Sequence, residues 1–173
     1  MTARSTKIVP KRSRKDNAAE RRIVDSARRH FFAHGFRGVT MDDLAGELGM
    51  SKKTLYACFP SKTDLLRAVV VDKFRAVEVD LERIAAGFSK DGLASLHRLL
   101  ACLQQHTEEI QPPFVRDIRR EAPEIFELVQ KRRRQVIQRY FGKLFDECRL
   151  RIPAAEAELK QPPRSELTWE EEL

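Results

Sequence analysis

Apolar residues first recur at a helical interval near the start of the chain. Ile23, Ala27 and Phe31 are four residues apart, which places their side chains on one face of a helix. We expect this helix to span about residues 18–34. Gly35 should end it, because glycine readily takes the positive φ found at many helix ends.

The next stretch, residues 40–62, has the pattern of two short helices joined by a tight turn. Leu44 and Leu48 place apolar side chains on one side of the first helix, and Leu55 faces back from the second. Gly49 lies between them and can take the positive φ of the turn. This arrangement predicts a helix-turn-helix motif.

Both short helices begin with a residue that can cap them. Thr40 is followed three residues later by Asp43, and Ser51 precedes the second helix. Lys52 and Lys53 come directly after Ser51, although positive charge is unfavourable at a helix N-terminus. Because such departures from a local rule tend to lie at functional sites, we interpret this helix start as a phosphate receptor on a DNA-recognition helix.

Downstream of this motif the apolar spacing predicts further helices and no strands. They are a helix of about 28 residues starting near residue 61, a helix around 93–103, a short segment 114–120 and a long helix 124–149. Pro112 and Pro113 are expected to end the helix before them. The predicted fold class is therefore all-α.

Net charge is distributed unevenly along the chain. Residues 1–62 hold 14 Lys and Arg against 6 Asp and Glu, a net charge of +8, whereas the remainder sums to −1. A basic segment attached to a neutral body indicates a polyanion-binding module, and the helix-turn-helix pattern selects double-stranded DNA as the polyanion. Residues 1–16 are expected to be a disordered basic arm, which either follows DNA or only aids solubility.

Several classes of protein are disfavoured. No apolar run approaches the roughly 18–20 residues of a membrane span, and three widely spaced cysteines suit reduced thiols in a cytoplasm. We find no pairing of nucleophile and base, no glycine-rich phosphate loop and no set of metal ligands at a known spacing. The expectation is a soluble, cytoplasmic protein that is not an enzyme and uses no metal or cofactor.

At this point many residues agree, in order, with one known family. They are Ile23 and Ala27, Phe31-Phe32, Gly35-Phe36, Gly38-Val39-Thr40, Leu44-Ala45, Leu48-Gly49-Met50-Ser51, Thr54-Leu55-Tyr56, Phe59, Lys62 and Leu65-Leu66. In this stretch the chain resembles the N-terminal domain of the TetR family of bacterial transcriptional regulators. The resemblance implies an N-terminal three-helix helix-turn-helix domain followed by a helical effector-sensing and dimerisation bundle. It also implies a homodimer that binds a palindromic operator, usually with repression relieved by a small molecule.

The resemblance also implies which residues contact DNA. Thr40 and Tyr56 would each meet a phosphate, and Lys62 would contact the backbone from the start of the following helix. The exposed start of the recognition helix would supply the remaining contacts, from Ser51, Lys52, Lys53 and Thr54. Cys58 departs from the family, which commonly has His or Tyr there. It is either a small half-buried residue or a redox switch, and we favour the first.

The expected domains are an arm at 1–16, the DNA-binding domain at 17–62, a regulatory domain at 63–152 and an irregular acidic tail at 153–173. The helical pattern weakens after Leu150, whereas the resemblance implies two further substantial helices that form most of the dimer interface. Either the bundle is shortened at its C-terminus, or dimerisation uses the 124–149 helix. The rival interpretation is a truncated helical protein-interaction or dominant-negative module without stable, specific DNA binding.

The effector pocket has no sequence signature of its own. His97, His106 and Gln104 lie near apolar stripes but are expected at the surface. The basic run 131–134 is either an anion-binding feature or, as we favour, a solvated face.

Overall fold

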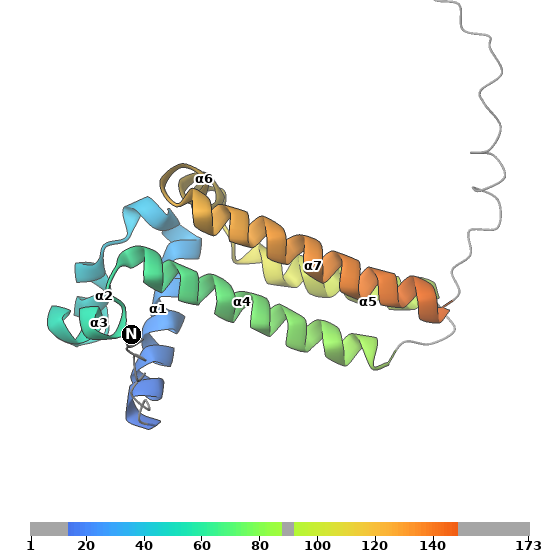
Figure 1. Cartoon of the computed structure of the whole chain (residues 1–173), viewed down its shortest axis with the longest axis horizontal. Helices are drawn as coiled ribbons and strands as arrows, with labels where there is room; N and C mark the ends of the chain where they lie inside the picture. Colours follow the sequence, from blue (N-terminus) through green and yellow to red (C-terminus); the bar gives the residue numbers. More distant parts are fainter. Residues whose placement is uncertain (1–13, 88–91, 149–173) are drawn as a thin grey trace, which may run out of the picture.

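The computed structural model describes residues 14–87 and 92–148, and all regular elements in these ranges are helices. In chain order they are α1 (Arg14–Gly38), α2 (Met41–Glu47), α3 (Lys52–Cys58), α4 (Lys62–Ala85), α5 (Gly92–Glu108), α6 (Pro112–Glu121) and α7 (Pro123–Cys148). Figure 1 shows α1–α3 gathered at one end of the molecule, with α4, α5 and α7 running side by side away from them. The all-α prediction is confirmed. None of the described helices combines the length and apolar character needed to cross a membrane.

The course of α1 changes at Gly35. This residue has φ of 84°, so the helix that holds Ile23, Ala27 and Phe31 ends there and a short continuation leads to Val39. The helical end predicted at Gly35 is thus confirmed. The start differs, because α1 already begins at Arg14, inside the range expected for the arm. The rest of the arm lies outside the described residues.

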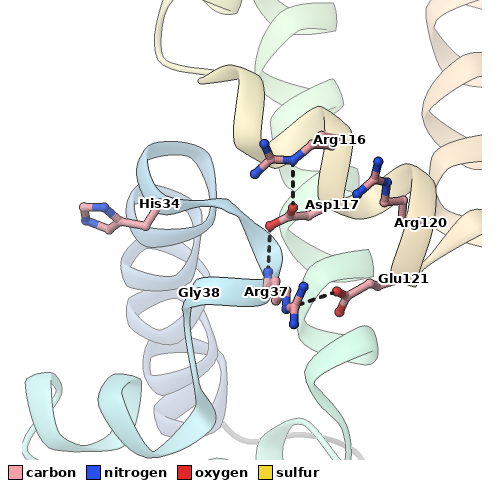
Figure 2. A pocket seen from close by; sticks show the side chains of 7 residues that line it. All are labelled: His34, Arg37, Gly38, Arg116, Asp117, Arg120 and Glu121. Atoms are coloured by element: carbon pink, nitrogen blue, oxygen red, sulfur yellow. Dashed lines mark hydrogen bonds and ion pairs between the residues drawn. The ribbon is translucent and has the colours of Figure 1, made fainter.

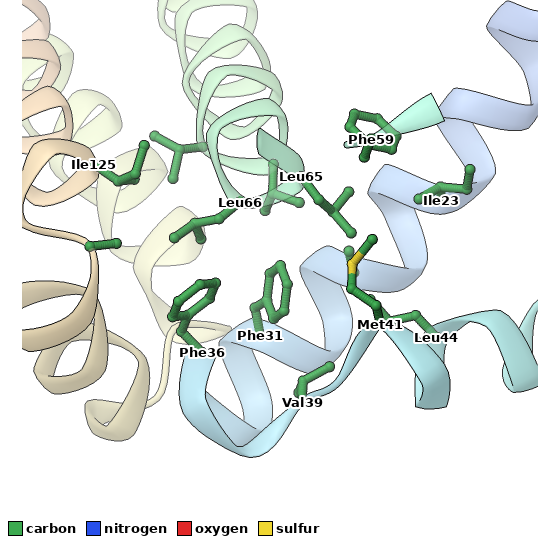
Figure 3. Packing of buried hydrophobic residues seen from close by; sticks show 14 of the residues in the cluster. Ile23, Phe31, Phe36, Val39, Met41, Leu44, Phe59, Leu65, Leu66 and Ile125 are labelled. Atoms are coloured by element: carbon green, nitrogen blue, oxygen red, sulfur yellow. The ribbon is translucent and has the colours of Figure 1, made fainter. Parts of the chain in front are cut away.

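A first hydrophobic core joins α1–α3 to the helices that follow them. Its α1–α3 members include Ile23, Phe31 and Leu55, and Leu65 and Leu66 enter it from the first turns of α4. Figure 3 shows Phe31, Leu65 and Leu66 in this cluster, and Ile125 of α7 belongs to the same core. Three further buried residues come from α6 and its end, Phe114, Ile118 and Ala122. This core therefore spans both sides of the domain boundary predicted at residue 62, and that boundary stays a prediction.

A second core lies between the far half of α4 and the helices α5 and α7. Val77, Leu81, Leu99 and Leu144 are buried in it, and so is Tyr140. The Tyr140 hydroxyl donates to the Glu78 carbonyl at 3.2 Å and lies 3.0 Å from a Glu82 carboxylate oxygen. A buried hydroxyl is costly without such partners. This core makes α4, α5 and α7 one three-helix unit.

Two predicted boundaries differ from the structure. The long helix α4 has 24 residues and ends at Ala85, short of the expected 28. Pro112 and Pro113 begin α6 and do not end a helix, since proline is well suited to the first helical turn. The preceding helix α5 has already ended at Glu108. The predicted tail, 153–173, and the weak pattern after Leu150 lie outside the described residues.

Candidate nucleic-acid interface

The first helix of the motif, α2, is fixed at its start by a reciprocal cap. The Asp43 amide donates to Thr40 Oγ1 at 3.1 Å, and the Thr40 amide donates to Asp43 Oδ2 at 3.0 Å. The Thr40 hydroxyl also donates to Asp43 Oδ2 at 2.6 Å. These bonds hold the pKa of Asp43 below its ordinary value, with the side-chain bond as the largest cause. Thr40 is exposed beside this cap.

The second helix of the motif, α3, is attached to the protein by one buried side chain. Leu55 is fully buried, whereas the other residues of α3 are exposed except Cys58, which is half-buried. Ser51 caps the helix, because its hydroxyl accepts from the Thr54 amide at 3.1 Å. The predicted recognition residues Ser51, Lys52, Lys53, Thr54 and Tyr56 therefore lie together on solvent-facing surface, and Tyr56 is 45% exposed.

The two lysines of α3 differ in their surroundings. Lys52 Nζ lies 2.5 Å from Asp42 Oδ2 on α2, and this hydrogen bond is the main reason that the pKa of Lys52 is raised. Lys53 forms no ion pair with any residue in the described part of the chain. Lys52 thus bridges the two helices of the motif, and Lys53 has a free ammonium group to offer a ligand.

Lys62 differs from the other predicted DNA contacts because it is half-buried. It lies at the start of α4, and its Nζ lies 4.3 Å from the centre of the Phe36 ring. Such a cation over an aromatic face is attractive. Burial lowers the pKa of Lys62. Lys62 therefore packs against the end of α1, and its predicted contact with a DNA backbone stays a prediction.

Cys58 is half-buried and packs against the first core. This placement agrees with the interpretation favoured from the sequence, a small residue that fills space at the end of α3.

A polar cluster that the sequence did not indicate locks α2 onto α1. Glu47 at the end of α2 accepts from the Ser26 hydroxyl at 3.1 Å and from Arg29 at 3.2 Å, and it pairs with His30. Ser26 is 1% exposed, and a buried hydroxyl requires such a partner. The sequence carries no local sign of this cluster, because its members are about 20 residues apart.

Comparison with known proteins agrees with this geometry. The sequence pattern of the family described as "Bacterial regulatory proteins, tetR family" matches residues 23–69, which contain the helix-turn-helix and its packing partners in α1 and α4. The match covers this N-terminal region, so the chain is similar to TetR-family regulators in its DNA-binding region. The matched range begins and ends close to the resemblance found in the sequence.

Two individual proteins are also similar to this chain. It is 34% identical over 102 residues to the uncharacterized HTH-type transcriptional regulator YvaF of Bacillus subtilis, an alignment that covers 58% of this chain and 53% of that protein. The chain thus matches about half the length of that relative. The crystal structure of a transcriptional regulator of the TetR/AcrR family from Thermobifida fusca matches with a TM-score of 0.53 at 24% identity, over 79% of this chain and 75% of that one. This second likeness concerns the fold.

A partly buried polar network within the bundle corrects one expectation from the sequence. His106 was expected at the surface, but its ring lies between α4 and α5, with Nε2 3.0 Å from Asp80 and Nδ1 3.2 Å from Lys73 Nζ. Lys73 is 9% exposed and also pairs with Glu109. An apolar stripe alone does not show which neighbouring polar residue faces inward, so the sequence could not predict this network.

The basic run 131–134 lies on α7, largely in solvent. Arg132 is half-buried and its Nη1 lies 3.8 Å from Glu78 on α4, whereas Lys131, Arg133 and Arg134 are exposed. This agrees with the favoured interpretation of a solvated face.

Proposed function

We propose that this chain is a sequence-specific DNA-binding transcriptional regulator that contacts base edges with α3. The observation that carries the proposal is the exposure of α3. A seven-residue helix that buries one side chain and presents two lysines, a threonine and a tyrosine, with a serine at its N-cap, gains little by packing. The same residue types donate to phosphates and to base edges in known complexes. The regulators to which the chain is similar support the same assignment.

We assign distinct roles to the residues of this surface. Lys53, which has a free ammonium group, and Thr54 are the candidates for base contacts from the start of α3. Lys52, which is tied to Asp42, and Tyr56 are placed to meet phosphates, and Thr40 would do so from the start of α2. Ser51 caps α3 and could add a phosphate contact.

The oligomeric state, the operator symmetry and the mode of regulation are proposed from the similarity to TetR-family regulators. We propose a homodimer on a palindromic operator, because two copies of α3 related by a two-fold axis would contact two half-sites about one DNA turn apart, roughly 34–36 Å. Repression, with release by a small-molecule effector bound among the regulatory helices, is the mode typical of the family. The rival, a helical protein-interaction module, predicts no specific DNA binding.

The proposal is tested by removing the two lysines together. Duplexes that bind the wild-type chain are first selected from random DNA, and affinity for the enriched sequence is then measured by fluorescence anisotropy. Lys52→Ala with Lys53→Ala should lower this affinity by about tenfold or more, since two charged contacts are lost. The melting temperature should stay close to that of wild type, because both side chains are exposed.

A matched control removes the same net charge elsewhere. Arg133→Ala with Arg134→Ala deletes two exposed cations from α7, and the affinity should stay within a few-fold of wild type. Equal losses in the two double variants would mean that net charge, and not α3, governs binding. A wild-type chain that enriches no sequence would favour the protein-interaction module.

A further inference from the structure

The connection between α1 and α2 determines where the helix-turn-helix begins. After the kink at Gly35 the chain passes through Phe36, Arg37 and Val39 to the cap residue Thr40. Phe36 and Val39 are buried in the first core, 5% and 4% exposed. Any displacement of this connection would therefore displace the start of α2.

A carboxylate from α6 holds this connection. Asp117 Oδ2 accepts a hydrogen bond from the Arg37 backbone amide at 3.0 Å, although the two residues are 80 positions apart. Asp117 is only 8% exposed, and its second oxygen lies 3.6 Å from Arg116 Nε. Figure 2 shows the Asp117 side chain directed at the amide. Asp117 also lines an open pocket of about 630 Å³ between α1 and α6. A buried carboxylate requires such donors to offset its lost hydration.

The backbone at Gly35 is shaped to admit this carboxylate. A Cβ at this position would lie 2.5 Å from Asp117 Oδ2 and 3.2 Å from Pro113 Cβ. The φ of 84° is itself a conformation that residues with a side chain rarely adopt. Two separate features of the sequence, a glycine in α1 and an aspartate in α6, thus serve one contact.

Further contacts bind α6 to the same part of α1. The Gln111 amide donates to the Phe32 carbonyl at 2.9 Å, and the Phe32 and Phe114 rings pack edge to face at 4.8 Å. At the other end of α6, Glu121 lies 3.7 Å from the Arg37 guanidinium. The first turn of α6, its middle and its end all touch α1, so α6 cannot shift without straining the connection to α2.

We propose that Asp117 is a positioning residue for DNA binding. Its carboxylate holds the Arg37 amide, fixes the connection that leads to Thr40, and so sets the orientation of α2 and α3. The inference rests on the proposed function, because its consequence is a change in DNA affinity, but Asp117 itself touches no DNA.

The test combines two readouts on three variants. Asp117→Ala removes the acceptor, whereas Asp117→Asn keeps a side-chain oxygen and loses only the charge. Hydrogen exchange at the Arg37 amide should accelerate in the alanine variant and stay slow in the asparagine variant. Affinity for the selected duplex should fall in the alanine variant by about 5- to 150-fold, the usual range of coupling between sites, and recover most of that loss with asparagine.

Leu99→Ala separates positioning from general destabilisation. Leu99 is fully buried in the second core, away from α1 and α6, so this variant should lose stability while keeping wild-type DNA affinity at temperatures where it is folded. If Leu99→Ala lowers the affinity as much as Asp117→Ala does, Asp117 has only a structural role and the inference is wrong.

Other outcomes also decide the question. If hydrogen exchange at the Arg37 amide is unchanged in Asp117→Ala, the contact does not hold the connection between α1 and α2. If exchange is faster but DNA affinity is unchanged, the connection does not determine DNA binding. Either result overturns the inference. Should Asp117→Ala fail to fold, Asp117→Ser replaces it, because the shorter hydroxyl does not reach the Arg37 amide. If the wild-type chain binds no duplex, the proposed function is wrong, and so is the inference that rests on it. That failure differs from a failure of Asp117, in which wild type binds and the variants bind equally.

Discussion

At the scale of single residues, the side chains that the sequence placed correctly belong to local patterns. Leu55 faces inward and Lys53 outward because both follow from the helical period around Ser51. The contact of Asp117 with the Arg37 amide could not be foreseen. It joins positions 80 apart, and a lone aspartate on a short helix carries no sign of a partner so distant.

The close approach at Gly35 should make the protein sensitive to substitution there. Gly35→Ala should lower the free energy of unfolding by about 1–3 kcal/mol, because alanine is strained at positive φ and its Cβ would meet Asp117 and Pro113. Urea denaturation measures the change. Gly38→Ala is the matched control, since a Cβ there meets no atom within 4 Å, and it should be neutral or slightly stabilising. Equal effects of the two substitutions would show that the close approach at Gly35 is unimportant.

At the scale of elements, helix existence followed from apolar periodicity, whereas the arrangement of helices did not. The double proline before Phe114 was interpreted as a helix end, yet α6 begins there, because proline breaks a helix interior but suits its first turn. Helix α4 contributes side chains to both hydrophobic cores. Helix α6 also packs against the DNA-binding end, because its Ile118 shares the first core with α1–α3.

The stability that Tyr140 contributes where α7 packs against α4 should depend on pH. Burial raises the pKa of the Tyr140 hydroxyl, so the folded chain retains this proton more tightly than the unfolded chain, in which tyrosine titrates near about pH 10. The stability from the protonated hydroxyl is complete below that pH and is lost as the pH rises through the folded pKa.

Tyr140→Phe should therefore lower the free energy of unfolding by about 0.5–1.5 kcal/mol at pH 8, because it removes the hydrogen bonds to Glu78 and Glu82. The difference from wild type should shrink between pH 9 and about pH 11 as wild type alone loses this contribution. Thermal melts across that range measure both effects. Tyr56→Phe, at an exposed position, should show neither, and a pH-independent difference for Tyr140→Phe would refute the assignment.

At the scale of the whole molecule, α5 and α7 expose large apolar side chains. Leu93 and Leu100 on α5 are 61% and 47% exposed, and Ile137 and Phe145 on α7 are 41% and 49% exposed. Scattered exposed apolar residues are common on monomers. We propose that the two on α7 take part in dimerisation, which stays a prediction.

Sedimentation velocity tests this expectation. At micromolar concentration the wild-type chain should sediment as a dimer, and Ile137→Lys with Phe145→Lys should shift it toward the monomer, because two charges would be buried in the interface. Affinity for a two-half-site duplex should fall with the dimer fraction. Val79→Lys, at a 54% exposed position on α4, is the control and should remain dimeric. A wild-type monomer at these concentrations would contradict the proposed mode of binding.

We propose that α3 determines which DNA sequence the chain binds. This is tested by comparing the sequences that wild type and Lys53→Ala select from random DNA. We predict a two-fold symmetric consensus for wild type. The variant should lose preference at one base position in each half-site, with the other positions retained, because a single base contact is worth about 1–3 kcal/mol of discrimination. An identical consensus for both proteins, with affinity lowered uniformly, would place Lys53 on the phosphates, and the absence of any consensus for wild type would contradict the claim altogether.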